Sequence, residues 1–508
     1  MLVGQNPYQD FAAAALQKAA EFVEGVKGGD LSKAITLASG ITGPSLHGPL
    51  LQLTPLLTGF ANSIPTEIVS PGSDAYAYKA ITKITMPRGA VAERRGAALF
   101  GTTVVDRSNS YSSVGVGGEV TWEAEKQSGG FEPALKLETA NALLVALRLL
   151  DMLGFGARKT AYAAPANPAV SVAATGGSIG TSTPFFKVAA VTPQVAAMLE
   201  PDQPADYDGT HANLAGRDIV AADVDVTAFN ADGTGGFGIG PLSAEGTVTA
   251  GGGSTNRWKL TWDAVPGAGG YLVFVGTVTG NANLKLNALV TQASITLTSF
   301  ATGGLAASTL VDSSADATSQ ATFFSGMVEQ LFTAGSGAYI KNVAGKLTGT
   351  GGEVLEIQDA FASAWRTGRV KRFKLLVSGQ DVRILTRLGI VQNSMNIVVS
   401  PSTEGRLDMT MGGFVGKIIN QTGGVECPIE VQPNLPPGMI IGTPMEIPYN
   451  EAKVRNPWEW KLISDWERIE YGMQRSGGPV YMFEPRTRRT LVGRFPGGCF
   501  VLHNIFKG

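Results

Sequence analysis

The residues that could catalyse a reaction or bind a metal ion are few in this sequence and lie far apart. Its three histidines are His47, His211 and His503, and none belongs to an HExxH or similar metal-binding spacing. Cys427 and Cys499 lack metal-ligand spacing and cannot form a disulfide framework, so we expect two buried, reduced thiols. The sequence therefore predicts no catalytic centre, no metal site and no cofactor.

Three short motifs match known signatures only in part. The stretch GTGGFG at 233–238 fits the dinucleotide-binding fingerprint, but no helix follows it and Pro241 comes soon after. NVAGKLTG fails the phosphate-loop pattern, because Ile340 stands where the first glycine belongs. NQT at Asn420 is a chance glycosylation match, since the N-terminus does not resemble a signal peptide. We expect none of the three to be functional.

Basic residues gather in two places. WRTGRVKRFK and EPRTRR leave two interpretations open: a solvated face with inter-subunit ion pairs, or a weak surface for phosphates. These residues are Arg366, Arg369, Lys371, Arg372 and Lys374 in the first cluster, and Arg486, Arg488 and Arg489 in the second.

The composition indicates a large protein with covered surfaces. Its 508 residues suggest two to four domains, and a net charge of −2 gives no sign of a dedicated nucleic-acid binder. Only 16% of the residues are charged, against roughly 25% in an average protein. No run reaches about 18 uninterrupted apolar residues, so we expect no membrane span. Low charge with abundant glycine suggests surface that other subunits cover, although large β-rich monomers have a similar composition.

The first third of the chain should position an extended hairpin beside a long helix. We expect a helix over 11–26, an irregular arm over 30–75, and strands in AYKAITKIT and GEVTWEAE joined through a basic tip. The tip carries Arg88, Arg94 and Arg95. A lone hairpin is only marginally stable in water, so something should pack on it. The segment 134–154 predicts a helix that is apolar nearly all round.

The composition changes sharply between residues 165 and 310. Short alternating runs replace helices, and five basic against ten acidic residues give a charge of −5, which leaves +3 for the rest of the chain. Trp258, Leu260 and Trp262 share one strand face by period two. We expect Trp262 and Tyr271 to form the core pair of a small sandwich.

These residues resemble fibronectin type III and related immunoglobulin-like sandwiches. LTWDAVPGAGGYLVFVG and ASITLTSF match strands that recur in that family. PFFKVAAVT and GPLSAE look like the family's last two strands, although here they come first. The order fits a circular permutation, which would bring both ends of an inserted module together.

Beyond residue 320 helices and strands mix again, and the chain without the insert resembles the major capsid protein of tailed bacteriophages, a fold shared with encapsulins. The resemblance rests on the order of elements and on ECPIEVQPNLPPGMIIGTP. It implies an α+β capsid fold with an inserted all-β immunoglobulin-like sandwich. The implied parts are an N-terminal helix and arm (1–75), an E-loop (76–127), a peripheral domain with spine helix (128–164), the insert (165–310), and an axial domain with return strands (311–508).

In that family function is self-assembly. The resemblance implies a non-enzymatic structural protein that forms hexamers and pentamers of an icosahedral phage head in the host bacterial cytoplasm. Implied partners are scaffold and portal proteins, packaged double-stranded DNA, and a decoration protein or host-surface glycan at the insert. Candidate contacts between subunits are Arg88, Arg94, Arg95, Trp122 and Glu123.

Two other functions stay open. An encapsulin-like shell would hold protein cargo, and nuclease-protected DNA in isolated particles would argue against it. An exported adhesin or glycan-binding protein would use the insert itself, but the absent signal peptide weighs against it.

Overall fold

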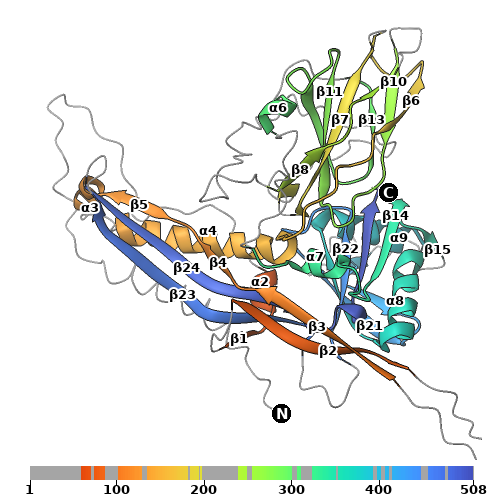
Figure 1. Ribbon diagram of the computed structural model, residues 1–508. Coiled ribbons are helices and arrows are strands. Elements are labelled where there is room, and N and C mark those ends of the chain that lie inside the picture. The colour runs from red at the N-terminus through yellow and green to blue at the C-terminus, as the bar shows by residue number, and fades with distance from the viewer. Residues whose placement is uncertain are drawn as a thin grey trace, which may run out of the picture. The chain divides into compact units, whose positions relative to one another are not determined.

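The structure of the chain, a computed structural model, mixes helices and strands throughout (Figure 1). The α+β class predicted from the sequence is therefore confirmed. The predicted helix over 11–26 and most of the arm over 30–75 lie outside the described residues. The structure describes residues 59–69, 74–85, 101–128, 134–180, 183–193, 195–196, 238–248, 255–299, 306–310, 323–350, 353–392, 398–401, 407–410, 415–447, 456–474 and 479–506.

The chain divides into two compact units. The smaller unit comprises Met1–Ser63, Ser113–Leu150 and Ser464–Arg488, and the larger comprises Ile64–Ser112, Asp151–Ile463 and Arg489–Gly508. Three long elements, α4 (Ala134–Gly156), β23 (Trp458–Gln474) and β24 (Val480–Gly493), contribute residues to both.

The smaller unit contains α2 (Phe60–Ser63), β4 (Ser112–Gly115, from its second residue on), β5 (Gly118–Thr121) and α3 (Trp122–Ser128). β5 pairs antiparallel with β24, which brings Gly118 beside Phe483. A Cβ on Gly118 would lie 2.5 Å from the Phe483 ring, so only glycine fits there. Phe483 is buried with Val120 and Ala142, and this cluster packs the sheet against α4.

One sequence prediction in this region was wrong. GEVTWEAE was expected to be a strand of the hairpin, but only Gly118–Thr121 is extended, and the helix α3 begins at Trp122. The Thr121 hydroxyl accepts a hydrogen bond from the Ala124 N–H (3.3 Å) and caps this helix. Glu123 and Glu125 lie in its first turn, where the helix dipole favours negative charge.

The larger unit contains a six-stranded sheet of order β14-β25-β22-β17-β21-β20. The aromatic rings of Phe361, Phe373 and Phe500 meet at centroid distances of 5.1–5.6 Å in its core. The strands are β14 (Tyr339–Gly345), β17 (Phe373–Val377), β20 (Lys417–Asn420), β21 (Val425–Val431), β22 (Ile440–Pro444) and β25 (Phe500–Ile505).

Helices α8 (Leu355–Gly368) and α9 (Gly379–Gln392) supply apolar side chains to the same core. α8 ends at Arg369, whose φ of 56° is left-handed. Shorter elements of this unit are β1 (Thr66–Ile68), α7 (Met327–Phe332) and η2 (Pro496–Gly498), with the two-stranded ribbons β15 (Gly349–Thr350) with β16 (Glu353–Val354) and β18 (Val398–Pro401) with β19 (Leu407–Thr410).

Strands between residues 169 and 297 form two sheets that share one core, and we call them the module. One sheet has the order β13-β10-β6 and the other β12-β11-β7-β8, with β9 pairing β7 (Figure 1). Their bounds are β6 (Ala169–Ala173), β7 (Phe185–Val191), β8 (Ile239–Leu242), β9 (Gly246–Thr247), β10 (Arg257–Thr261), β11 (Gly270–Gly276), β12 (Lys285–Val290) and β13 (Ser294–Leu297). The short helix α6 (Ala307–Leu310) follows.

The module's core contains the aromatic residues singled out in the sequence. Trp258, Leu260 and Trp262 are buried, and Trp262 lies 5.3 Å from Tyr271 in an edge-on contact. The two rings belong to different sheets, so the turn after β10 crosses between sheets rather than closing a hairpin. The Tyr271 hydroxyl accepts a hydrogen bond from the Val265 N–H (2.7 Å), and burial raises the pKa of Tyr271.

Among the described residues, α4 is long and apolar enough to cross a membrane by length and composition alone. Half of its most apolar window is buried inside the protein. Core helices of soluble proteins meet the same criterion, so this helix alone is weak grounds for a membrane span. It runs two residues beyond Gly154, where the sequence suggested its end.

Candidate functional site

The most unusual surface of the described chain is the hairpin of β2 (Ala75–Thr85) and β3 (Gly101–Ser110). Their antiparallel register runs from Ala75 opposite Ser110 to Thr85 opposite Gly101, with an irregularity between Ile81 and Lys83. The two strands form a sheet of their own, with no third strand among the described residues. Both edges therefore present backbone groups that could pair with another chain.

Beyond its base, the described part of the hairpin has exposed side chains on both faces of β3. Val104 and Val105 are consecutive and so point to opposite faces of β3, yet they are 52% and 37% exposed. The ion pair between Lys79 and Asp106 is also open to solvent, with both side chains 77% exposed. A ribbon of this length gains little stability alone, so its apolar side chains call for a partner.

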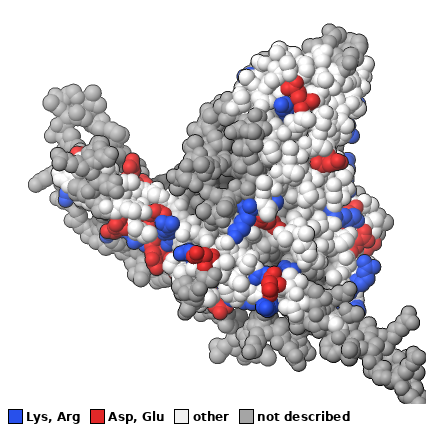
Figure 2. All heavy atoms as spheres, in the orientation of Figure 1, with Lys and Arg blue, Asp and Glu red and all other residues white. Residues whose placement is uncertain are grey.

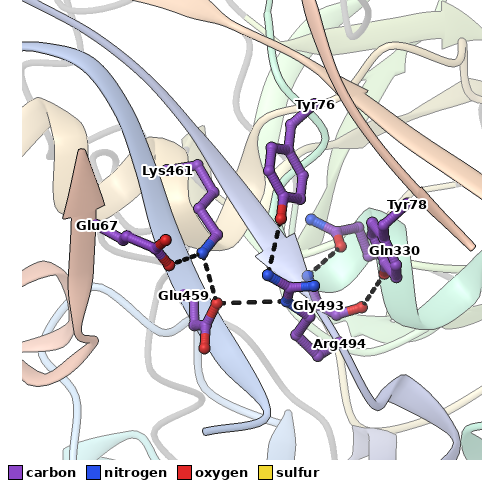
Figure 3. Close-up of polar contacts among 8 residues, drawn as sticks. All are labelled: Glu67, Tyr76, Tyr78, Gln330, Glu459, Lys461, Gly493 and Arg494. Carbon is purple, nitrogen blue, oxygen red and sulfur yellow. Dashed lines mark hydrogen bonds and ion pairs between the residues drawn. The ribbon is translucent and has the colours of Figure 1, made fainter. Parts of the chain in front are cut away.

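The base of the hairpin, in contrast, is held firmly through β2. The Tyr78 hydroxyl donates to the Gly493 carbonyl (2.5 Å), and the Arg494 guanidinium donates to the Tyr76 hydroxyl (2.8 Å) (Figure 3). The same guanidinium lies 5.4 and 5.3 Å from the two tyrosine rings. Gln330 of α7 accepts a hydrogen bond from the Gly493 N–H (2.9 Å), which fixes the end of β24.

Ion pairs extend this network to β1 and β23. Lys461 is 1% exposed and contacts the carboxylates of Glu67 and, at 2.9 Å, Glu459 (Figure 3). Glu459 also pairs with Arg494 at 3.3 Å, so one carboxylate joins two cations. We call Glu67, Tyr76, Tyr78, Glu459, Lys461 and Arg494 the clamp.

The ion pair between Lys461 and Glu67 shifts the pKa of each residue toward its charged form. Burial lowers the pKa of Lys461, but its hydrogen bonds to Glu67 and Glu459 outweigh burial, so the net shift is upward. The hydrogen bond from Lys461 lowers the pKa of Glu67. Both shifts favour the charged forms, and the pair is ionised at neutral pH.

The second strand of the hairpin is held by a separate set of bonds. The Asn109 amide donates to the carbonyls of Leu491 (2.7 Å) and Ser325 (3.1 Å) and accepts from the Ser325 N–H (2.9 Å). The Lys159 ammonium donates to the Ser110 hydroxyl. Both strands are thus fixed at one end, and the rest of the hairpin extends from a rigid base.

The sequence singled out Arg88, Arg94 and Arg95 at the hairpin tip, and these lie outside the described residues. Trp122 and Glu123 begin α3 in the smaller unit, where Trp122 is 41% exposed and Glu123 is exposed. They lie on a helix and not on the hairpin, so the structure does not unite them with β2 and β3.

The first basic cluster surrounds the end of α8. Arg369 and Lys371 lie 5.6 and 5.1 Å from the Trp365 ring. Arg372 pairs with Glu446 at 3.6 Å, and Lys374 pairs with Glu430. Burial lowers the pKa of Lys374. Arg366, Arg369, Lys371 and Arg372 are exposed, and only Lys374 is partly buried.

The second basic cluster does not form one surface. Arg486 is exposed, Arg488 is intermediate, and Arg489 is buried with its guanidinium 5.9 Å from the Trp460 ring. Strand alternation divides the three residues between faces of β24. On the face drawn in Figure 2, acidic and basic side chains lie close together and are sparse over the module.

The structure describes several of the remaining candidates for chemistry. Cys427 and Cys499 are buried and form no disulfide, and Asn420 is buried as the last residue of β20. His503 is buried against Phe332, which lowers its pKa to about 4. The first half of NVAGKLTG lies on β14, whereas 233–237, His47 and His211 lie outside the described residues. No cluster of metal-ligating side chains occurs among the residues that the structure describes.

Sequence reasoning missed the clamp. Its members come from four segments, and Glu67 and Lys461 are 394 positions apart. The only local signal was the alternation of charged and aromatic residues in WEWK, which any half-buried strand could show.

Comparisons with solved structures give matches along nearly the whole chain. The capsid of a native GTA particle is 8% identical over 94% of this chain and 99% of that chain, with a TM-score of 0.37. The capsid of Myoviridae phage XM1 is 8% identical over 93% and 100%, with a TM-score of 0.38. The likeness is to capsid proteins. A holo-SrpI encapsulin complex from Synechococcus elongatus is 7% identical over 92% and 93%, with a TM-score of 0.38.

No protein-family model matches the chain, and no curated protein matches it.

Proposed function

We propose that this protein is the major capsid protein of a tailed bacteriophage, a structural subunit of a closed shell. The observation that carries the proposal is the β2–β3 hairpin, which is fixed at its base by the clamp, pairs with no third strand among the described residues, and exposes Val104 and Val105 on opposite faces of β3. A rigid projecting ribbon with exposed valines suits a protein that buries this surface in neighbouring copies. Obligate interfaces of this kind are large and apolar.

In the proposed assembly, hexamers and pentamers form an icosahedral head in the bacterial cytoplasm. The hairpin would overlap a neighbouring subunit, and α4 would serve as the spine helix of a peripheral domain. Scaffold and portal proteins would direct assembly and DNA entry. The proposed domains are 1–75, 76–127, 128–164, 165–310 and 311–508, with the E-loop strands themselves confined to β2 and β3.

The module would be a fibronectin-like display domain on the outer surface. Its sheet orders support the permuted arrangement, because β7 and β8 precede β10 in the chain, yet β7 pairs with β11 and β8 pairs with β7 in the same sheet. A decoration protein or a host-surface glycan would be its partner. Arg366, Arg369 and Lys371 are exposed or near Trp365 and are the best-placed described residues for non-specific contact with packaged DNA.

The experiment is a double substitution, Val104→Asp with Val105→Asp, in the full chain. Both side chains are exposed, so we expect unchanged circular dichroism but no shells or capsomers by negative-stain electron microscopy and sedimentation. Val278→Asp is the matched control, since Val278 is 55% exposed in a loop of the module. Wild-type protein that stays monomeric with co-expressed scaffold, or a double variant that assembles normally, would refute the proposal.

A further inference from the structure

The module contacts the six-stranded sheet of the larger unit through a buried asparagine. Asn504, on β25, accepts a hydrogen bond from the Ala293 N–H in the turn between β12 and β13 (2.8 Å). Its amide nitrogen donates to the Asn342 side-chain oxygen of β14 (2.9 Å). Asn504 is 7% exposed, so these bonds form away from water and are costly to leave unmade.

The backbone at this contact is specialised. Asn504 has a φ of 59°, a left-handed conformation that asparagine tolerates better than most residues. Nearby, Gly438 has a φ of 86°, and a Cβ there would lie 3.4 Å from the Thr291 hydroxyl. Asn504 on β25 and Gly438, which precedes β22, thus both have a left-handed backbone where the turn 291–293 approaches the six-stranded sheet.

A second turn of the module docks on α7. Gly267 has a φ of 78°, and a Cβ there would lie 3.4 Å from Val328 and 3.5 Å from Phe332. The Tyr162 hydroxyl donates to the Gly267 carbonyl, and the Arg158 guanidinium stacks 3.9 Å from the Tyr162 ring. The turn is therefore held between α7 and the chain that enters the module.

That entering chain is itself bound to α7 by one carboxylate. Glu329 is 4% exposed and accepts hydrogen bonds from the N–H groups of Lys159 and Thr160 and from the Thr160 hydroxyl, at 2.6–3.0 Å. Charge-assisted bonds of this kind are stronger than neutral ones and hold two backbone positions.

We infer that the module is a brace for the six-stranded sheet and not a freely tethered decoration. Two of its turns and its entering chain are fixed to α7 and β25, which gives three separated attachments. β11 ends and β12 begins at the other end of the module, so the loop of residues 277–284 there stays available to an outside partner. The inference does not depend on shell assembly.

The test compares amide hydrogen exchange in the full chain with and without the asparagine side chain. Asn504→Gly keeps the left-handed backbone accessible and removes both side-chain bonds. We expect the Ala293 amide to exchange at least about tenfold faster, the effect of losing one buried hydrogen bond. Asn504→Asp retains an acceptor for the Ala293 N–H and should preserve most of the protection.

Asn283→Gly is the matched control, because the Asn283 amide bonds the Thr279 carbonyl at the far end of the module. It should leave the Ala293 amide unchanged. A second variant, Leu260→Ala in the module's core, should also speed exchange in β25 if the module braces it. Unchanged Ala293 exchange in Asn504→Gly, or unchanged β25 exchange in Leu260→Ala, would overturn the inference.

Discussion

Lys461 is a lysine held almost wholly out of water by acidic groups from two strands. It is 1% exposed, and its ammonium contacts Glu67 and Glu459. Lys461→Met should lower the free energy of unfolding by about 1–3 kcal/mol, because two carboxylates lose a donor. The expected loss of unfolding free energy is smaller than for breaking an isolated buried ion pair, because Glu459 keeps its ion pair with Arg494. Urea unfolding at neutral pH measures it.

Lys79→Met is the control for this measurement. Lys79 pairs with Asp106 at 3.6 Å, but both side chains are 77% exposed, so water screens the pair. Its removal should change the unfolding free energy by less than about 0.5 kcal/mol. Equal losses at Lys461 and Lys79 would mean that the clamp does not stabilise the fold.

His503 makes stability depend on pH in one direction. Burial lowers its pKa in the folded protein to about 4, below the unfolded value of about 6.5. Between these values the unfolded chain binds more protons, so the stabilising contribution is complete above about pH 6.5 and falls as the pH drops toward 4. The loss is at most about 3 kcal/mol.

The measurement is urea unfolding of wild type and His503→Gln between pH 7.5 and about 3.5, a range that brackets both pKa values. The difference in free energy of unfolding between wild type and His503→Gln should decrease as the pH falls. A difference that does not change with pH would contradict the lowered pKa of His503.

At the scale of elements, α9 depends on a reciprocal cap at its start. The Ser378 hydroxyl donates to the Asp381 carboxylate (2.7 Å) and accepts from the Asp381 N–H (3.2 Å). Asp381 also accepts from the Gly438 N–H at 2.9 Å. Ser378→Ala should cost about 1–2 kcal/mol of unfolding free energy, measured in urea, because the cap is buried. Ser178→Ala, at an exposed bond to the Thr298 carbonyl (3.3 Å), should cost under about 0.5 kcal/mol.

Elements with a strong local pattern could be read from the sequence. The alternation of Trp258, Leu260 and Trp262 gave the inward face of β10, and the apolar run at 134–154 gave α4 with its start unchanged at Ala134. The residues Tyr271, Val273 and Val275 were placed correctly on one face of β11, although both faces of this strand are buried and apolar residues do not alternate with polar ones. Its residues Leu272 and Phe274 pack in a second cluster on the opposite face from Tyr271.

Three features of the structure were missed in the sequence, and only one of them depends on residues far apart in the chain. The alternation in VTWEAE is typical of a strand. The signals for the helix α3 are the N-cap residue Thr121 and the acidic residues Glu123 and Glu125 in the first turn. The clamp joins residues from both ends of the chain, so no window of the sequence contains it. Strand alternation in EPRTRR, by contrast, could have shown that Arg489 is separated from the exposed arginines.

At the scale of the whole molecule, the contents of the particle separate the proposed shell from an encapsulin-like one. Particles isolated from infected cells should retain DNA after nuclease treatment, because a genome-bearing head encloses it. Gel electrophoresis of the extracted nucleic acid, with free DNA added to a parallel sample as the digestion control, measures this. Closed particles that contain protein and no protected DNA would favour a cargo-storing shell.

The two cysteines have a practical consequence for the chemistry of the assembled particle. Both thiols are buried, and burial raises the pKa of Cys427 and brings that of Cys499 to about 12, so neither offers a reactive thiolate at neutral pH. Val278→Cys, at an exposed loop position, would then be the sole site open to a maleimide reagent. If the chain forms the proposed shell, one label per subunit, attached to a loop of the braced module, would make the particle an array for ordered presentation of fluorophores or antigens.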